Sequence, residues 1–171
     1  MRGLVYIFCI LIESRPKGKH KNYLKSVIKD IYKYDRYIKC LVYNSGGLNS
    51  SCTAAEAVRE LKAECPGIEL CIVMPFLPLE DEYLEVLDKK TEGLCDSVII
   101  PDAWLEEAGI YSQIQRVITE RLVCQSDMLI IDAPIVTGFL GRIVKLANDM
   151  GVKVHNLYFD SLNSSEQDGE F

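Results

Sequence analysis

The chain has 171 residues, 49% of them hydrophobic, and a formal net charge of −6. That length and composition predict one globular domain and exclude a disordered chain. The longest apolar run, residues 4–12, is shorter than the roughly 20 residues that span a membrane, so we expect no membrane partner.

Apolar runs alternate with amphipathic patterns along the chain. We interpret the first run, 4–12, as a buried strand in preference to a secretory signal, because no small-residue cleavage site follows it. In chain order the expected elements are this strand, helix 19–32, strand 37–43, helix 52–64, strand 68–73, helix 80–90, strand 97–100, helix 111–124, strand 128–131, helix 138–150 and strand 152–157.

The expected strands are near-continuous hydrophobic runs, which are typical of a parallel sheet buried on both faces. Their alternation with helices predicts an α/β fold. It would be a Rossmann-like three-layer sandwich, with a mostly parallel, doubly wound sheet of about six strands and helices on both faces. We expect a single domain over residues 1–159, followed by an acidic, disordered tail over residues 160–171.

Seven cysteines and two histidines bear on the compartment and on metal binding. No two cysteines have the CxxC spacing, and most lie in apolar runs, where they act as small hydrophobes. We therefore expect a reduced, cytoplasmic protein with no metal site and no cofactor. His155 falls inside the last expected strand, and we interpret it as a satisfied, partly buried side chain.

Positive charge gathers near the start of the chain. Residues 15–39 hold nine basic and two acidic side chains, although the chain as a whole is acidic. Lys25, Lys29 and Lys33 are four residues apart, so they share one face of a helix whose opposite face is apolar. We interpret them as a solvated helix face. No arginine-rich or aromatic-interleaved surface accompanies them, so we do not expect a nucleic-acid partner.

Two loops that contain glycine follow expected strands and lead into helices. In open parallel sheets, ligands bind beyond the carboxyl ends of the strands, where helix N-termini favour anions. The loops could also be no more than tight turns, because neither is a GxGxxG or a GxxxxGK[ST] motif. The candidate ligand-binding residues are Ser45, Gly46, Gly47 and Ser51 in the first loop, and Thr137, Gly138 and Gly141 in the second.

Charged residues near the strand ends divide into two groups. Arg15, after the first expected strand, could clamp a phosphate or carboxylate, or could be a surface arginine. Glu56 could act as a general acid or base or accept hydrogen bonds from sugar hydroxyls; it could equally be a first-turn acid favoured by the helix dipole. Asp96 and Asp127 open strands at the opposite end of the sheet, and we interpret both as structural.

Several short motifs occur in the order found in one family. SRP at 14–16, SGG at 45–47, AAEAVRELK at 54–62, MPF at 74–76 and SDMLI at 126–130 are its main blocks. On these blocks the chain resembles the YpsA-like family of the SLOG (Smf/DprA–LOG) superfamily over about residues 4–158. The resemblance implies a Rossmann-like fold that binds a nucleotide or a nucleotide-derived ligand, and it makes a homodimer an expectation. The residues that it assigns to the site are Arg15, Ser45, Gly46, Glu56, Pro75, Phe76 and Gly138.

The sequence also departs from the family pattern at several positions. Ser51 stands where the family has an aspartate, and Ile118 and Thr119 stand where it has arginine and asparagine. Phe139 replaces the second glycine of its GGT motif. The hydrolase pattern PGGxGTxxE is not present. These departures weaken the expectation of hydrolase chemistry more than the expectation of the fold.

Three functions remain open from the sequence. The first is the binding of a nucleotide-type small molecule. The second is an N-glycosidic-bond enzyme, of the nucleotide phosphoribohydrolase or nucleoside deoxyribosyltransferase type, with Glu56 as the first candidate for its catalytic carboxylate and Asp102 as the second. The third is an interaction protein that uses the basic helix and keeps only a vestigial pocket.

Overall fold

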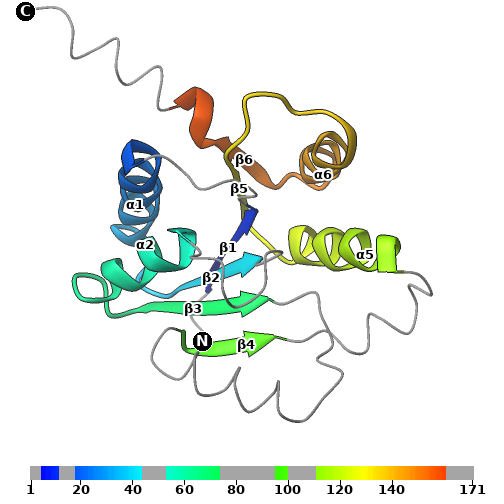
Figure 1. Cartoon of the computed structure of the whole chain (residues 1–171). Coiled ribbons are helices and arrows are strands. Elements are labelled where there is room, and N and C mark those ends of the chain that lie inside the picture. Colours follow the sequence, from blue (N-terminus) through cyan, green and yellow to red (C-terminus); the bar gives the residue numbers. More distant parts are fainter. Residues whose placement is uncertain (1–4, 12–17, 44–52, 74–94, 100–110, 161–171) are drawn as a thin grey trace, which may run out of the picture.

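This computed structural model describes residues 5–11, 18–43, 53–73, 95–99 and 111–160 (Figure 1). The strands are β1 (Tyr6–Leu11), β2 (Ile38–Tyr43), β3 (Ile68–Val73), β4 (Ser97–Ile99), β5 (Met128–Ile131) and β6 (Lys153–Asn156). The helices are α1 (Gly18–Tyr32), α2 (Thr53–Lys62), α5 (Tyr111–Cys124) and α6 (Gly138–Asp149). These elements match those expected from the sequence within a few residues at each end. The expected helix 80–90 lies outside the described residues.

The six strands form one parallel sheet in the order β4-β3-β2-β1-β5-β6. The chain therefore runs outward from β1 to β4 and then crosses to the other side of β1. Helices α1 and α2 cover one face of the sheet, and α5 and α6 cover the other (Figure 1). This arrangement confirms the predicted α/β, Rossmann-like, doubly wound fold.

Both faces of the sheet are buried, which explains why its strands are mostly near-continuous apolar runs. On one face, Phe8 and Ile10 of β1 belong to the same core cluster as Leu24 and Ile28 of α1. On the other face, Leu129 of β5 belongs to a second cluster with residues of α5 and α6. Burial raises the pKa of the Cys9 thiol to about 12, so this cysteine acts as a core hydrophobe and not as a nucleophile.

Two aspartates join neighbouring strands at the amino edge of the sheet. The Asp127 N–H donates to the Ile7 carbonyl, and the Ile7 N–H donates to Asp127 Oδ2, both at 2.8 Å. In the same way, the Asp96 N–H donates to the Leu70 carbonyl at 2.9 Å, and the Leu70 N–H donates to Asp96 Oδ2 at 2.7 Å. Each carboxylate thus extends a parallel ladder by one position, in keeping with the structural role expected from the sequence. The carboxyl edge lies on the opposite side of the sheet.

Two classes of feature are not found among the residues described. None of their helices has the length and apolar character needed to cross a bilayer. Nor do they contain a cluster of three or more His, Cys, Asp or Glu side chains that could hold a metal ion.

Candidate functional site

The strand order places a topological switch point between β1 and β5. The carboxyl ends of these strands lie side by side, with Leu11 opposite Ile131. The chain leaves β1 toward one face of the sheet and leaves β5 toward the other. In open α/β sheets, ligands bind in the crevice outside the strands at such a point. The candidate site is therefore at the carboxyl ends of β1 and β5.

A buried histidine–aspartate pair lies at the switch point. Asp132 directly follows β5, and His20 lies in the first turn of α1. His20 Nδ1 is 2.9 Å from Asp132 Oδ2, and the two side chains are only 6% and 4% exposed. The contact closes a separation of 112 residues along the chain. The ring of Tyr158 packs edge-on against the imidazole, with 6.1 Å between the ring centroids.

Sequence reasoning did not find this pair, because it treated His20 as part of a basic helix and Asp132 as the start of a loop. The sequence held only a weak signal for this pair. Asp132 directly follows one buried strand, and His20 lies in the first turn of the helix that follows another. The carboxyl ends of parallel strands share one edge, and only the strand order shows that β1 and β5 are neighbours.

The turn between β5 and α6 is held from two sides. Asp132 is bound by His20 of α1, as described above. The next residue, Ala133, donates its N–H to Asn156 Oδ1 at 3.2 Å and accepts from Asn156 Nδ2 at 2.8 Å. Asn156 is the last residue of β6. The turn is therefore held in place by side chains of α1 and β6.

Thr137, Gly138 and Gly141 come together at the start of α6, as the sequence predicts. Thr137 occupies the N-cap position with an extended backbone and makes no capping hydrogen bond through its side chain. Gly138 has a φ of 58°, a conformation that favours glycine. The first-turn N–H groups of a helix have no partner within it, and the helix dipole adds positive potential there. This helix start can thus accept an anion.

The other predicted ligand-binding residues lie outside the described residues. They are Arg15, Ser45, Gly46, Gly47, Ser51, Pro75 and Phe76. Their roles stay predictions. Of the family departures, Ile118 and Thr119 are fully buried on α5, where the Thr119 hydroxyl donates to the Arg116 carbonyl. Phe139 is partly buried against the core on the same face of the sheet.

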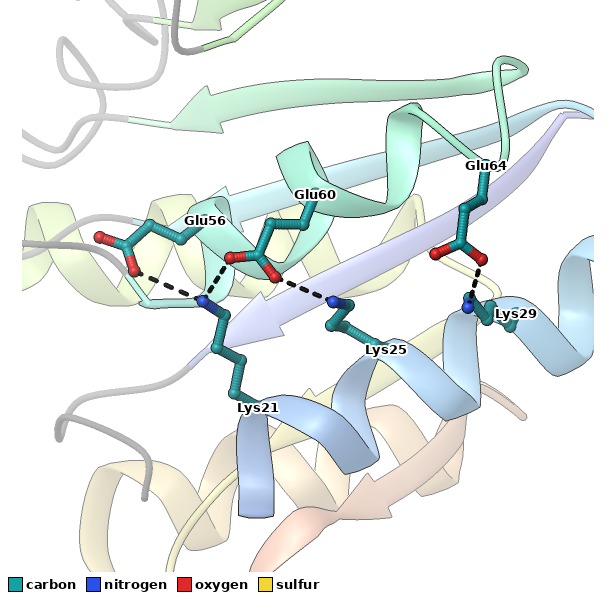
Figure 2. Close-up of polar contacts among 6 residues, drawn as sticks. All are labelled: Lys21, Lys25, Lys29, Glu56, Glu60 and Glu64. Atoms are coloured by element: carbon teal, nitrogen blue, oxygen red, sulfur yellow. Dashed lines mark hydrogen bonds and ion pairs between the residues drawn. The ribbon is translucent and has the colours of Figure 1, made fainter. Parts of the chain in front are cut away.

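Glu56, the predicted catalytic carboxylate, lies in the first turn of α2 and faces α1 (Figure 2). Its Oε2 is 3.8 Å from Lys21 Nζ, and Lys21 also donates to Glu60 at 2.6 Å. Two further pairs, Lys25–Glu60 at 2.8 Å and Lys29–Glu64 at 2.5 Å, continue along the two helices. We refer to these six residues, Lys21, Lys25, Lys29, Glu56, Glu60 and Glu64, as the lysine–glutamate ladder.

The ladder corrects one expectation from the sequence. Lys25 and Lys29 are partly exposed but do not face solvent alone, because they pair with carboxylates of α2 (Figure 2). Only Lys33 stays with its own helix, where it binds Asp30. The sequence pattern showed which face of α1 is charged, but the acidic partners come from another helix, packed beside it on the same face of the sheet.

We expect the ladder to make stability fall in acid. Hydrogen bonds from Lys21 and Lys25 lower the pKa of Glu60 to about 2, from an ordinary value of 4.5. A carboxyl with a lowered folded-state pKa stabilises the fold fully above its unfolded value and loses that contribution as the pH falls toward the folded value. The gap in stability between wild type and Glu60→Gln should therefore narrow between pH 4.5 and pH 2. Urea unfolding across this range measures it.

Asp149→Asn is the control for this experiment, since Asp149 pairs with Lys145 inside one exposed helix. High salt should narrow the Glu60→Gln gap at neutral pH, because these side chains are solvent-accessible and their charges are screened. A gap that is the same at pH 6 and pH 2 would contradict the role given to the ladder.

The comparisons with known proteins concern the fold. No model of a known protein family matches the sequence, and no curated protein is similar to it. A solved structure that the chain resembles is DNA processing protein A from Helicobacter pylori, whose study concerns its single-stranded DNA binding mode. The alignment has 13% identity and a TM-score of 0.48, and it covers 94% of this chain and 73% of that one.

Membership in the YpsA-like family stays a prediction. One expectation from the sequence is corrected. The expectation of no nucleic-acid partner conflicts with what is described for this solved structure, single-stranded DNA binding, and we withdraw that expectation.

Proposed function

We propose that the chain binds a nucleotide or a nucleotide-derived ligand at the carboxyl ends of β1 and β5. The observation that carries the proposal is the buried His20–Asp132 pair at the topological switch point. A buried polar pair costs free energy unless its groups are well partnered, so its position at the ligand edge suits recognition better than packing. The turn held by Asn156 adds a prepared surface beside it.

The start of α6 is the place for the anionic part of such a ligand. Thr137 leaves its hydroxyl free of a capping bond, and the glycine at 138 leaves open space where a Cβ would stand. First-turn N–H groups bind phosphates through hydrogen bonds and the helix dipole together. Asp132 is an acidic side chain, so a phosphate is better accommodated at the helix start than against it.

The remaining finer predictions belong with this proposal. They are membership in the YpsA-like family, a cytoplasmic location and a homodimer. The inward faces of α5 and α6 are already used, since Ile118, Leu122 and Ile143 are buried in the core. A dimer would therefore need the outer faces of these helices. No contact among the described residues favours the N-glycosidic enzyme or the interaction protein over ligand binding.

A matched pair of glycine variants tests the proposal. Gly138 and Gly151 lie at opposite ends of α6, both have positive φ, and a Cβ at either would meet nothing within 4 Å. Gly138→Asn and Gly151→Asn should thus carry similar backbone strain, on the order of 1 kcal/mol. We expect only Gly138→Asn to weaken the binding of a nucleoside monophosphate, by about tenfold, because its side chain would compete for the helix N–H groups.

Calorimetric titration of the wild type with nucleoside monophosphates, ADP-ribose and NAD identifies a binder for this comparison. Thermal unfolding of both variants checks that their stabilities match. The proposal fails if no compound of this group binds at millimolar concentration, or if Gly151→Asn weakens binding as much as Gly138→Asn does.

A further inference from the structure

One side chain at the carboxyl edge of the sheet, that of Asn156, binds three backbone groups. Its Oδ1 accepts from the N–H of Ala133 and from the N–H of Tyr158, both at 3.2 Å. Its Nδ2 donates to the Ala133 carbonyl at 2.8 Å. In the pairing of β5 with β6, Asn156 lies opposite Ile131, and this is the last register pair. Beyond that pair, the Asn156 amide serves the backbone of Ala133 in place of a neighbouring strand.

An asparagine suits this position because its short side chain carries an acceptor and a donor together without a charge. An aspartate of the same size would have no hydrogen to offer to the Ala133 carbonyl when ionised. Backbone N–H and C=O groups that are removed from water need partners, and Ala133 is partly buried. The amide therefore lets the chain leave the sheet at Ala133 with both of its backbone groups satisfied.

The contacts of Asn156 close a ring at the topological switch point. Its bonds to Ala133 hold the residue next to Asp132, which binds His20 at 2.9 Å. Its bond to the Tyr158 N–H holds the residue whose aromatic ring packs edge-on against His20. We refer to these residues as the switch-point ring; its members are His20, Asp132, Ala133, Asn156 and Tyr158. The ring joins α1, the turn after β5 and the chain after β6.

From this ring we infer that Asn156 is a positioning residue for the ligand site. The inference rests on the proposed function, since it concerns the same site. Asn156 acts through Ala133, because residues 133–137 connect β5 to the start of α6, where the anionic part of the ligand is placed. A turn whose first residue is held to β6 has fewer conformations to lose when a ligand binds. Without the amide, that ordering cost falls on the binding of the anionic group.

The test measures how much the phosphate contributes to binding. A nucleoside monophosphate, ADP-ribose or NAD, whichever binds the wild type most tightly, is compared by calorimetric titration with the nucleoside that it contains. The readout is the dissociation constant of the nucleoside divided by that of the phosphate compound. In Asn156→Ala this ratio should be about tenfold smaller than in the wild type. A side chain that only stabilises the fold would weaken both ligands alike and leave the ratio unchanged.

Amide hydrogen exchange of the unliganded protein gives a second readout. The N–H groups of Ala133 and Tyr158 lose their common acceptor in Asn156→Ala, so both should exchange about tenfold faster than in the wild type. Exchange at Val152, whose N–H donates to the Ala147 carbonyl, should not change. Asn148→Ala is the matched control for both readouts, because Asn148 is an exposed asparagine in the last turn of α6. It should keep the wild-type ratio and the wild-type exchange.

Asn156→Gln is a second variant should Asn156→Ala unfold. It keeps the amide but sets it one methylene farther from the backbone, so it cannot hold Ala133 and Tyr158 where they lie in the wild type, and the ratio should fall partway. An unchanged ratio, unchanged exchange at Ala133, or an equal fall of the ratio in Asn148→Ala would overturn the inference and leave the proposed function standing. Failure of every one of these ligands to bind the wild type would overturn both.

Discussion

Replacement of Gly67 by alanine is expected to destabilise the fold by about 3 kcal/mol. A Cβ at this position would lie 1.8 Å from the carbonyl oxygen of Arg36 and 3.0 Å from its carbonyl carbon. Both are backbone atoms, so no side chain can turn aside to make room. The backbone on each side is also tied into the sheet, because the Ile38 N–H donates to the Gly67 carbonyl at 3.1 Å. Relief of the clash would therefore pull β2 and β3 out of register.

The shift of the urea midpoint at unchanged slope measures this loss. Gly141→Ala is the matched control, since a Cβ there would approach the Val136 carbonyl oxygen no closer than 3.4 Å within a regular helix. It should be neutral or slightly stabilising, because alanine favours the helix by about 1 kcal/mol. Equal stability of Gly67→Ala and the wild type would show that the backbone at Gly67 does not pack against the Arg36 carbonyl as described.

The second large effect is expected at the buried pair. Asp132→Ala should cost about 3 kcal/mol of folding free energy, since removal of one partner leaves a buried polar group without compensation. Asp160→Ala removes a carboxylate from a contact of nearly the same length, 3.0 Å against 2.9 Å. That pair is 24% and 33% exposed, whereas His20 and Asp132 are 6% and 4% exposed. Asp160→Ala should thus cost about 1 kcal/mol or less.

A double-mutant cycle separates the contact from other effects of each substitution. The loss in the double variant His20→Ala/Asp132→Ala should be clearly smaller than the sum of the single losses, because either change alone already breaks the contact. The corresponding cycle at His155 and Asp160 should show weak coupling. Additive losses at His20 and Asp132 would contradict the view that these residues act as a pair.

The order of strands and helices could be predicted because the spacing of hydrophobic residues is a local property of the sequence. Residues 68–73, for example, are apolar except for Glu69 and follow Pro66-Gly67, and the structure places β3 over those same residues. The helix starts were equally local, since a glycine or a small polar residue near a strand end indicates where a helix can begin. Thr137 and Gly138 were found on this basis.

The partners of charged residues could not be predicted in the same way. The spacing of Lys25 and Lys29 shows that they share a face, but it does not show what that face meets. Solvent was the simpler interpretation. The structure instead places α2 beside α1 on one side of the sheet, where Glu60 and Glu64 bind these lysines.

By itself, then, the sequence determined the alternation of elements and the burial of the sheet on both faces, and it predicted a ligand site at the carboxyl edge of the sheet. These follow from which residues are apolar and where each run ends. Only the tertiary structure decided which residues meet at that edge. His20 and Asp132 are 112 residues apart, and they meet because β5 pairs with β1 and not with β4. That pairing depends on the right-handed crossover and on which helices cover each face, and no local pattern encodes either of them.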